Sequence, residues 1–144
     1  MNLILNFIWL ICGGLFMAIA WFFAGLLAAI TIVGLPWAAA CLRIGVFTLL
    51  PFGHEAVDRR LLTGREDLGT GPLGTIANIL WLIPLGIPLA IGHLAAALAC
   101  AVTIIGLPFA WQHIKLAGIS LWPVGTEIVE IDVADAARRR TAFF

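Results

Sequence analysis

Two basic side chains, Arg43 and Lys115, each stand alone in a long apolar stretch of the chain. Arg43 is the only charged residue before Glu55, and Lys115 is the only one between Asp67 and Glu127. A basic group near the middle of a bilayer costs about 2.5 to 3.5 kcal/mol on insertion scales. The pair therefore indicates one of two situations. Either both charges face a hydrated path suited to anions or phosphate groups, or their long stems reach the lipid headgroups.

Polar neighbours accompany only the second of these charges. Gln112 lies one helical turn before Lys115, so the two share a helical face, and His113 lies beside them in the sequence. The candidate anion path therefore consists of Arg43, Lys115, Gln112 and His113. A single histidine in an apolar helix is most often a hydrogen-bonded packing residue, and a proton relay is the less favoured alternative for His113.

The sequence offers no residue pattern typical of an enzyme. It has no Ser–His or Cys–His pair at a meaningful spacing, no phosphate-binding loop, and no carboxylate inside either apolar stretch. Three cysteines lie far apart in apolar sequence and are expected to pack as small hydrophobic residues, at Cys12, Cys41 and Cys100. We therefore predict no catalytic residue, no metal, no cofactor and no nucleic-acid partner.

The composition assigns these residues to membrane helices. Of 144 residues, 62% are hydrophobic and 11% are charged, whereas charged residues make up about a quarter of a soluble domain. The two apolar stretches, 2–53 and 74–125, each exceed fifty residues, and one helical crossing needs about 20. The bilayer offers no water to the backbone, and the stretches lack the alternation of a barrel. We predict an all-α integral membrane protein with about four membrane helices.

The chain matches itself with an offset of 72 residues. The segment Thr31–Pro36 lies over Thr103–Pro108, and the alignment continues without a gap on both sides. Equivalent residues include the pairs Asn6 and Asn78, Trp9 and Trp81, Arg43 and Lys115, and Pro51 and Pro123. Shared hydrophobicity does not bring Trp, Pro and lone charges into register, so we predict two tandem copies of one helical unit.

Each unit is predicted to form a helical hairpin. Gly suits the position just past a helix end, and Pro suits the first turn of the next helix. The turns therefore fall at Gly34, Pro36, Gly106 and Pro108. The second arms, 36–50 and 108–122, are fifteen residues long, which gives about 22 Å against a hydrocarbon layer of about 30 Å. Whether these short arms span, re-enter or lie at the interface stays open.

Small residues recur one turn apart on the first arm of each unit, at Gly14, Ala18, Gly86 and Ala90. Such spacing lets helices approach closely, either within one chain or between copies. We predict a homo-oligomer, and because four short helices hardly enclose a pore, any conduction would need a ring of copies.

The charges divide the chain into four segments: membrane repeat 1 at 1–53, a cytoplasmic connector at 54–73, membrane repeat 2 at 74–125 and a cytoplasmic tail at 126–144. The connector and the tail each carry three arginines, and basic residues are retained on the cytoplasmic side. Both units therefore enter as parallel hairpins, with both termini cytoplasmic. The tail alternates over 127–132, which favours a short strand, with disorder as the alternative.

The repeated Thr-Ile-x-Gly-Leu-Pro segments, with Phe109–Ala117 and the closing Leu121–Gly125, resemble the YccF family of small bacterial inner-membrane proteins. The resemblance covers nearly the whole chain apart from the tail. It implies a multi-pass protein of the bacterial inner membrane. It supplies no activity and no catalytic residues to carry over.

Two functions from different classes stay open. The first is an oligomeric channel or transporter for small anions, which paired, Gly- and Pro-interrupted apolar segments favour slightly. The second is a non-conducting membrane scaffold or an accessory subunit of an envelope complex. The expected partners are the lipid bilayer, other copies of the chain and an anion ligand.

Overall fold

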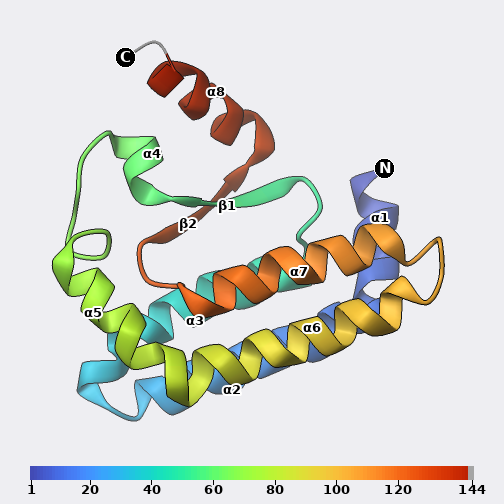
Figure 1. Cartoon of the computed structure of the whole chain (residues 1–144), viewed down its shortest axis with the longest axis horizontal. Helices are drawn as coiled ribbons and strands as arrows, with labels where there is room; N and C mark the ends of the chain where they lie inside the picture. Colours follow the sequence, from blue (N-terminus) through green and yellow to red (C-terminus); the bar gives the residue numbers. More distant parts are fainter. Residues whose placement is uncertain (143–144) are drawn as a thin grey trace.

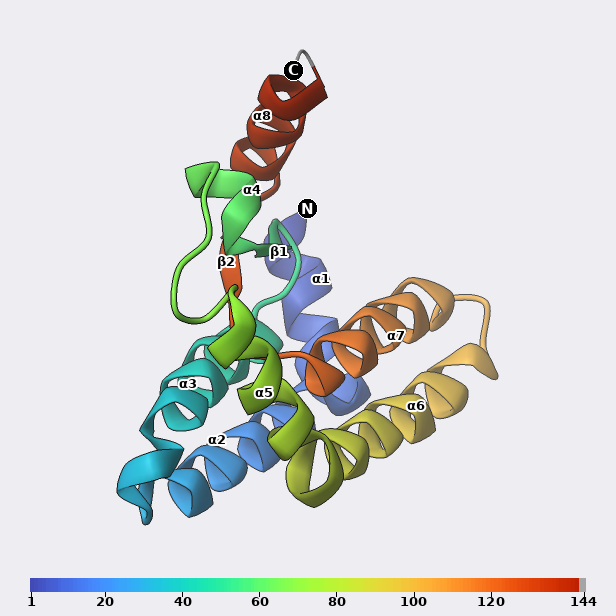
Figure 2. The same ribbon diagram turned by 60° about the vertical axis from the view of Figure 1, so that its left-hand side comes forward.

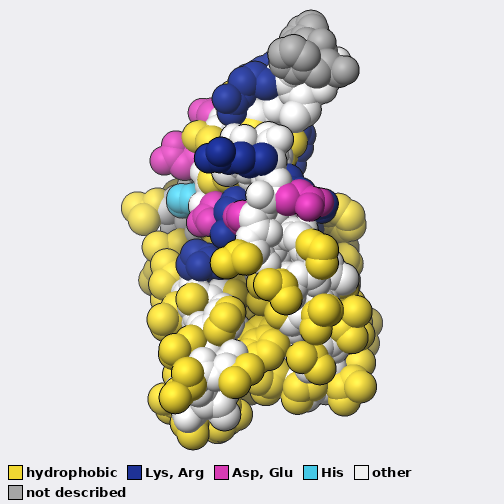
Figure 3. Space-filling view, turned by 90° about the vertical axis from the view of Figure 1, so that its left-hand side faces the viewer, with side chains coloured by type: hydrophobic (Ala, Val, Ile, Leu, Met, Phe, Trp, Pro, Cys, Tyr) yellow, Lys and Arg dark blue, Asp and Glu magenta, His cyan; other side chains and the backbone are white. Residues whose placement is uncertain are grey.

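A body of helices carries a smaller cap, which the connector and the tail build together (Figure 1). The structure is a computed structural model that describes residues 1–142. Phe143 and Phe144, which end the predicted tail segment, lie outside the described residues. On the face seen in Figure 3, charged side chains gather in the cap and apolar side chains cover the body. This division matches an apolar body in lipid and a cap in water.

The first unit consists of a short helix, a bend and a hairpin. Its elements are α1 (Asn2–Trp9), the π-type turn η1 (Leu10–Gly14), α2 (Leu15–Ala29), the 3₁₀ turn η2 (Ile32–Gly34) and α3 (Leu35–Leu49). The bend lies at Gly13, whose φ of 107° is readily available only to glycine and breaks the helix.

The second unit repeats this order. Its elements are α5 (Pro72–Trp81), the π-type turn η3 (Leu82–Gly86), α6 (Ile87–Ala101) and α7 (Leu107–Leu121). Here Pro84 lies within the bend, where its missing N–H interrupts the helical hydrogen bonds. Within residues 1–142, three segments are long and apolar enough to cross a membrane, judged by length and composition alone: Asn2–Ala29, Ile32–Leu49 and Pro72–Ala101.

Both hairpin turns close in the same way. The Thr31 hydroxyl accepts a hydrogen bond from Gly34 N at 3.0 Å, and the Thr103 hydroxyl accepts one from Gly106 N at 3.0 Å. Pro36 and Pro108 lie in the first turn of the helices that follow. In Figures 1 and 2 the two hairpins run crosswise to α1 and extend to opposite sides, so their turns lie far apart.

Matching hydrogen bonds tie the first helix of each unit to the end of its own second arm. Trp9 Nε1 donates to the carbonyl oxygen of Thr48 at 2.6 Å, and Trp81 Nε1 donates to that of Ser120 at 2.8 Å. One turn earlier, an asparagine amide bonds a backbone N–H and C=O at the end of the arm, in the pairs Asn6–Phe52 and Asn78–Val124. These contacts recur with the 72-residue offset.

The cap contains the elements β1 (His54–Asp58), α4 (Arg59–Thr63), β2 (Thr126–Glu130) and α8 (Ile131–Ala142). The strands pair antiparallel with Ala56 opposite Ile128, two residues that are 72 apart, so the register is centred on equivalent positions. The sheet is an addition to the predicted all-α class. Its strands are five residues long and more than sixty residues apart in the chain, so the alternation in the tail had no visible partner.

The turn from β1 into α4 depends on Asp58. Its carboxylate accepts a hydrogen bond from the backbone N of Arg60 at 2.8 Å and bonds the Arg60 guanidinium at 2.7 Å. The guanidinium holds the pKa of the Asp58 carboxyl below its ordinary value. A carboxyl with a lowered folded-state pKa stabilises the fold above its unfolded pKa, and loses that contribution as the pH falls through the lowered value.

We therefore expect α4 to open more readily below about pH 4. In the variant Asp58→Asn, which keeps the helix cap but loses the charge, amide hydrogen exchange in α4 should be about two- to fivefold faster at pH 7, because exposed ion pairs contribute little. Exchange in this variant, corrected for intrinsic rates, should change little between pH 7 and pH 3. An acid response as large as that of the native protein would assign the effect to another group.

Candidate functional site

A chain of hydrogen bonds crosses the centre of the body, where the two units meet. Trp21 Nε1 donates to His93 Nε2 at 3.1 Å, and His93 Nδ1 lies 3.0 Å from His113 Nδ1. His113 Nε2 lies 3.2 Å from the carbonyl oxygen of Cys12. All three ring systems are fully buried.

The groups at the two ends of this series of hydrogen bonds determine which nitrogen of each imidazole carries the proton. An indole N–H can only donate, so His93 Nε2 accepts and His93 carries its proton on Nδ1. His93 therefore donates to His113 Nδ1, and His113 donates from Nε2 to the Cys12 carbonyl. Both imidazoles are neutral in this arrangement. Every ring nitrogen has a partner, as a buried polar group requires.

The bend at Gly13 supplies the acceptor at the end of the chain. Cys12 has a non-helical ψ of 20°, which turns its carbonyl away from the helical ladder. That carbonyl also accepts a hydrogen bond from the Cys100 thiol at 3.3 Å. The Trp9 ring packs on His113 with 4.2 Å between centroids. This series of hydrogen bonds therefore joins η1 and α2 of the first unit to α6 and α7 of the second.

Arg43 lies in a groove between its own helix and the cap strand of the other unit. This groove, of about 500 Å³, is lined by Arg43 and His54 from the first unit and by Glu127 from β2; we call it the Glu127 groove. The side-chain Nε of Arg43 is buried and has no hydrogen-bond partner among residues 1–142.

Lys115 occupies the equivalent place in the second unit. A smaller groove, of about 230 Å³, is lined by Lys115, Gln112 and His54 and by Glu55 from β1; we call it the Glu55 groove. Glu55 and Glu127 are themselves 72 residues apart. Each membrane cation therefore shares a groove with a carboxylate from the other unit's cap strand. No ion pair within 4.0 Å joins either cation to a carboxylate in the described part of the chain.

The four residues of the candidate anion path do not line one cavity. Lys115 and Gln112 share the Glu55 groove, whereas Arg43 lines the Glu127 groove. His113 faces the opposite way, into the core, where His93 is its partner. The structure thus divides the candidate path into two boundary grooves and a buried pair.

The two glycines among the four small residues pack against tryptophans of their own units. A Cβ at Gly14 would overlap the indole nitrogen of Trp9, and one at Gly86 would lie 2.9 Å from Cδ1 of Trp81. Ala18 and Ala90 are buried as well. Gly14 and Gly86 therefore make room for tryptophans within one chain, and the homo-oligomer stays a prediction.

Comparison with known proteins identifies the protein family. The model of the YccF family, described as an inner membrane component domain, matches residues 4–54 and again residues 76–126. Together the two matches cover more than half of the chain. This chain belongs to the YccF family. It is 37% identical to the inner membrane protein YccF of Escherichia coli over 145 aligned positions, which cover 99% of this chain and 97% of that protein.

The YccF protein of Shigella flexneri matches this family member with the same identity and coverage. No solved structure matches the chain. The family and the apolar helices together assign the protein to the bacterial inner membrane.

The sequence analysis of this YccF-family chain considered His113 alone and did not predict its pairing with His93. His93 and His113 lie on different helices, and a twenty-residue separation has no helical periodicity that would bring them together. One signal was present. The first unit has Trp21 and Cys41 at the equivalent positions, so both changes to histidine occur in the same unit.

Proposed function

We propose that this YccF-family protein is a non-conducting module of the inner membrane, which is embedded through its two hairpins and presents its charged cap to the cytoplasm. The filled centre carries this proposal. Trp9, Trp21, His93 and His113 are fully buried where the units meet. A solute crossing through one copy would have to displace this close-packed, hydrogen-bonded cluster.

Such a module suits a scaffold or an accessory subunit of an envelope complex. The cap offers a folded polar surface, because ion pairs join its elements: Arg138 of α8 pairs with Glu55 of β1, and Arg59 of α4 pairs with Asp67 of the connector. The expectations that the protein is not an enzyme and binds no cofactor belong to the same proposal.

An anion channel formed by several copies is the second candidate. Arg43 and Lys115 favour it, because both line grooves between the body and the cap rather than the filled centre. In a ring of copies, such grooves would lie along subunit boundaries, where their positive potential would attract anions and repel cations.

Flux into liposomes separates the two candidates. The closed module predicts that vesicles with inserted protein are no leakier to anions than protein-free vesicles. The ring predicts a flux, and the double change Arg43→Glu and Lys115→Glu should abolish it or invert its selectivity. The matched double change to Gln should reduce it less.

The proposed topology places the N-terminus, connector and tail in the cytoplasm. Pairing of β1 with β2 supports a common side for connector and tail, and Asn2 lies against Gly53 at the same end of the body. The arginines of this side follow the positive-inside rule.

A thiol placed at exposed Leu68 tests this topology. In a background with the three native cysteines changed to alanine, Leu68→Cys should resist a membrane-impermeant maleimide in spheroplasts and react fully after lysis. A cysteine introduced into a periplasmic loop of an unrelated membrane protein serves as the reactive control. Labelling of Leu68→Cys in intact spheroplasts would reverse the orientation.

A further inference from the structure

A third groove, distinct from the two that hold Glu55 and Glu127, opens where α7 meets the cap. It has a volume of about 420 Å³. Lys115 and Gly118 line it from one face of α7, because a spacing of three residues places them on the same side of a helix, and Trp122 lines it just past the end of α7. Asp58, Arg60 and three threonines line it from the cap side and the start of α5. We call it the Arg60 groove.

The floor of the Arg60 groove is left open at Gly118. No atom lies within 4 Å of the position that a Cβ would take there. The equivalent residue in the first unit is Val46, which lines the mainly apolar Glu127 groove. The second unit therefore has space at a point where the first unit has a side chain.

Two cations and one carboxylate line the Arg60 groove: Lys115, Arg60 and Asp58. Arg60 pairs with Asp58 at 2.7 Å and lies 3.6 Å from Glu66, which is outside the lining, and its side chain is still 50% exposed. Asp58 bonds the Nε–H and one Nη2 donor of the guanidinium, so other donors stay available to a ligand. Lys115 is exposed and forms no ion pair within 4.0 Å among residues 1–142. Because Asp58 and Glu66 balance Arg60, Lys115 supplies the positive charge that a ligand would balance.

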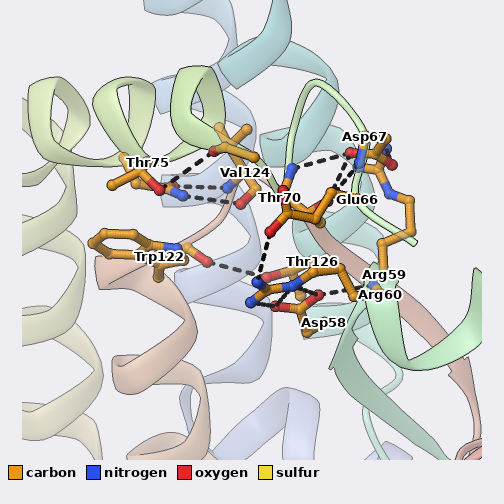
Figure 4. A network of polar contacts seen from close by, with 12 residues as sticks. Asp58, Arg59, Arg60, Glu66, Asp67, Thr70, Thr75, Trp122, Val124 and Thr126 are labelled. Atoms are coloured by element: carbon orange, nitrogen blue, oxygen red, sulfur yellow. Dashed lines mark hydrogen bonds and ion pairs between the residues drawn. The ribbon is translucent and has the colours of Figure 1, made fainter. Parts of the chain in front are cut away.

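The groove lies where the apolar body meets the cap. Trp122 is 46% exposed at the boundary between the apolar body and the cap, and tryptophans favour the membrane–water interface. Figure 4 shows Asp58 and Arg60 on the cap side of this region, with Trp122 and Thr75 opposite them. A phosphodiester carries one negative charge and several acceptor oxygens, which match Lys115 and the free Arg60 donors.

We propose that the Arg60 groove binds the phosphate group of a membrane phospholipid. The phosphate lies between Lys115 and Arg60, and the open space at Gly118 admits the glycerol end of the lipid. The proposal is independent of whether the protein conducts a solute.

Native mass spectrometry of the whole protein tests this site. Protein in a non-ionic detergent is titrated with dioleoyl phosphatidylglycerol, and in parallel with dioleoylglycerol, which has the same chains but no phosphate. We expect the phospholipid to be retained and dioleoylglycerol to be lost. Loss of one charged contact should lower retention by about tenfold or more in Lys115→Gln.

Gly118→Leu should remove retention to a similar extent, because the new side chain fills the groove. Val46→Leu is the matched control in the other unit and should retain the phospholipid as the native protein does. An unchanged melting temperature shows that a variant is folded. If Gly118→Leu does not fold, Lys115→Gln still tests the site.

Three results would overturn the proposal. The first is equal retention by the native protein and both groove variants. The second is equal retention of dioleoylglycerol, which would remove the role of the phosphate. The third is displacement of the phospholipid by millimolar inorganic phosphate, which would make the free ion the ligand.

Discussion

Replacing Gly14 with alanine is expected to destabilise the protein strongly. The new Cβ would overlap the indole nitrogen of Trp9, a fully buried side chain whose N–H bonds the carbonyl of Thr48 at 2.6 Å. Overpacking costs about 1 to 3 kcal/mol, and a buried group left without its hydrogen bond costs about 1 to 3 kcal/mol more. The free energy of unfolding should therefore fall by about 2 to 6 kcal/mol.

Gly118→Ala is the matched control for that change. It also adds one methyl group to a helix interior, but no atom lies within 4 Å of the new Cβ. Helix propensity predicts a stabilisation of up to about 1 kcal/mol. Both free energies are measured by reversible unfolding in mixed micelles of mild detergent and dodecyl sulfate. Equal stability of the two variants would show that Trp9 does not depend on the space at Gly14.

Replacing His113 with phenylalanine is expected to lower the free energy of unfolding strongly as well. The change removes the acceptor of the His93 N–H and one of two donors to the Cys12 carbonyl, all within the centre of the body. Each buried polar group without a partner costs about 1 to 3 kcal/mol. We expect a loss of about 2 to 5 kcal/mol, since the Cys100 thiol still bonds the carbonyl.

The double variant distinguishes a connected chain from two separate histidines. His93→Phe and His113→Phe each leave Nδ1 of the other imidazole without a partner, whereas the double variant has no imidazole to leave unpaired. The double variant should therefore lose less than the sum of the single variants, with an interaction free energy of about 0.5 to 3 kcal/mol. Additive losses in the same micelles would mean that the two rings do not stabilise each other.

The helical membrane class and the family could be predicted because their signals are local. Apolar length requires helices in a bilayer, and Gly and Pro act on the residues beside them. In the structure Gly34 and Gly106 lie at turns for this reason, each bonded to a threonine three residues earlier.

The features that were missed depend on contacts between elements that no local pattern brings together. The β1–β2 sheet and the carboxylates that share grooves with Arg43 and Lys115 join residues from opposite halves of the chain. The His93–His113 pair joins the two arms of the second unit. A duplication indicates which residues are equivalent but not which face each other. Even so, the sheet register and the Trp21–His93 bond both join residues 72 apart, so contacts between equivalent positions mark where the units meet.

The position of Arg43 and Lys115 lowers the free-energy cost that these two charges are expected to have in a membrane. Both line grooves bordered by cap strands, so neither has to bear the full cost of a charge at the bilayer centre. Their presence is thus compatible with a protein that conducts nothing. Conduction would need copies arranged so that these grooves meet.

Chloride flux into liposomes that contain inserted, folded protein is the most direct test of the closed centre. The account predicts a flux equal to that of protein-free vesicles under either polarity of the membrane potential, because Trp9, Trp21, His93 and His113 fill the place where the units meet. A chloride flux that rises with the amount of inserted protein, and that Arg43→Glu with Lys115→Glu abolishes, would contradict it.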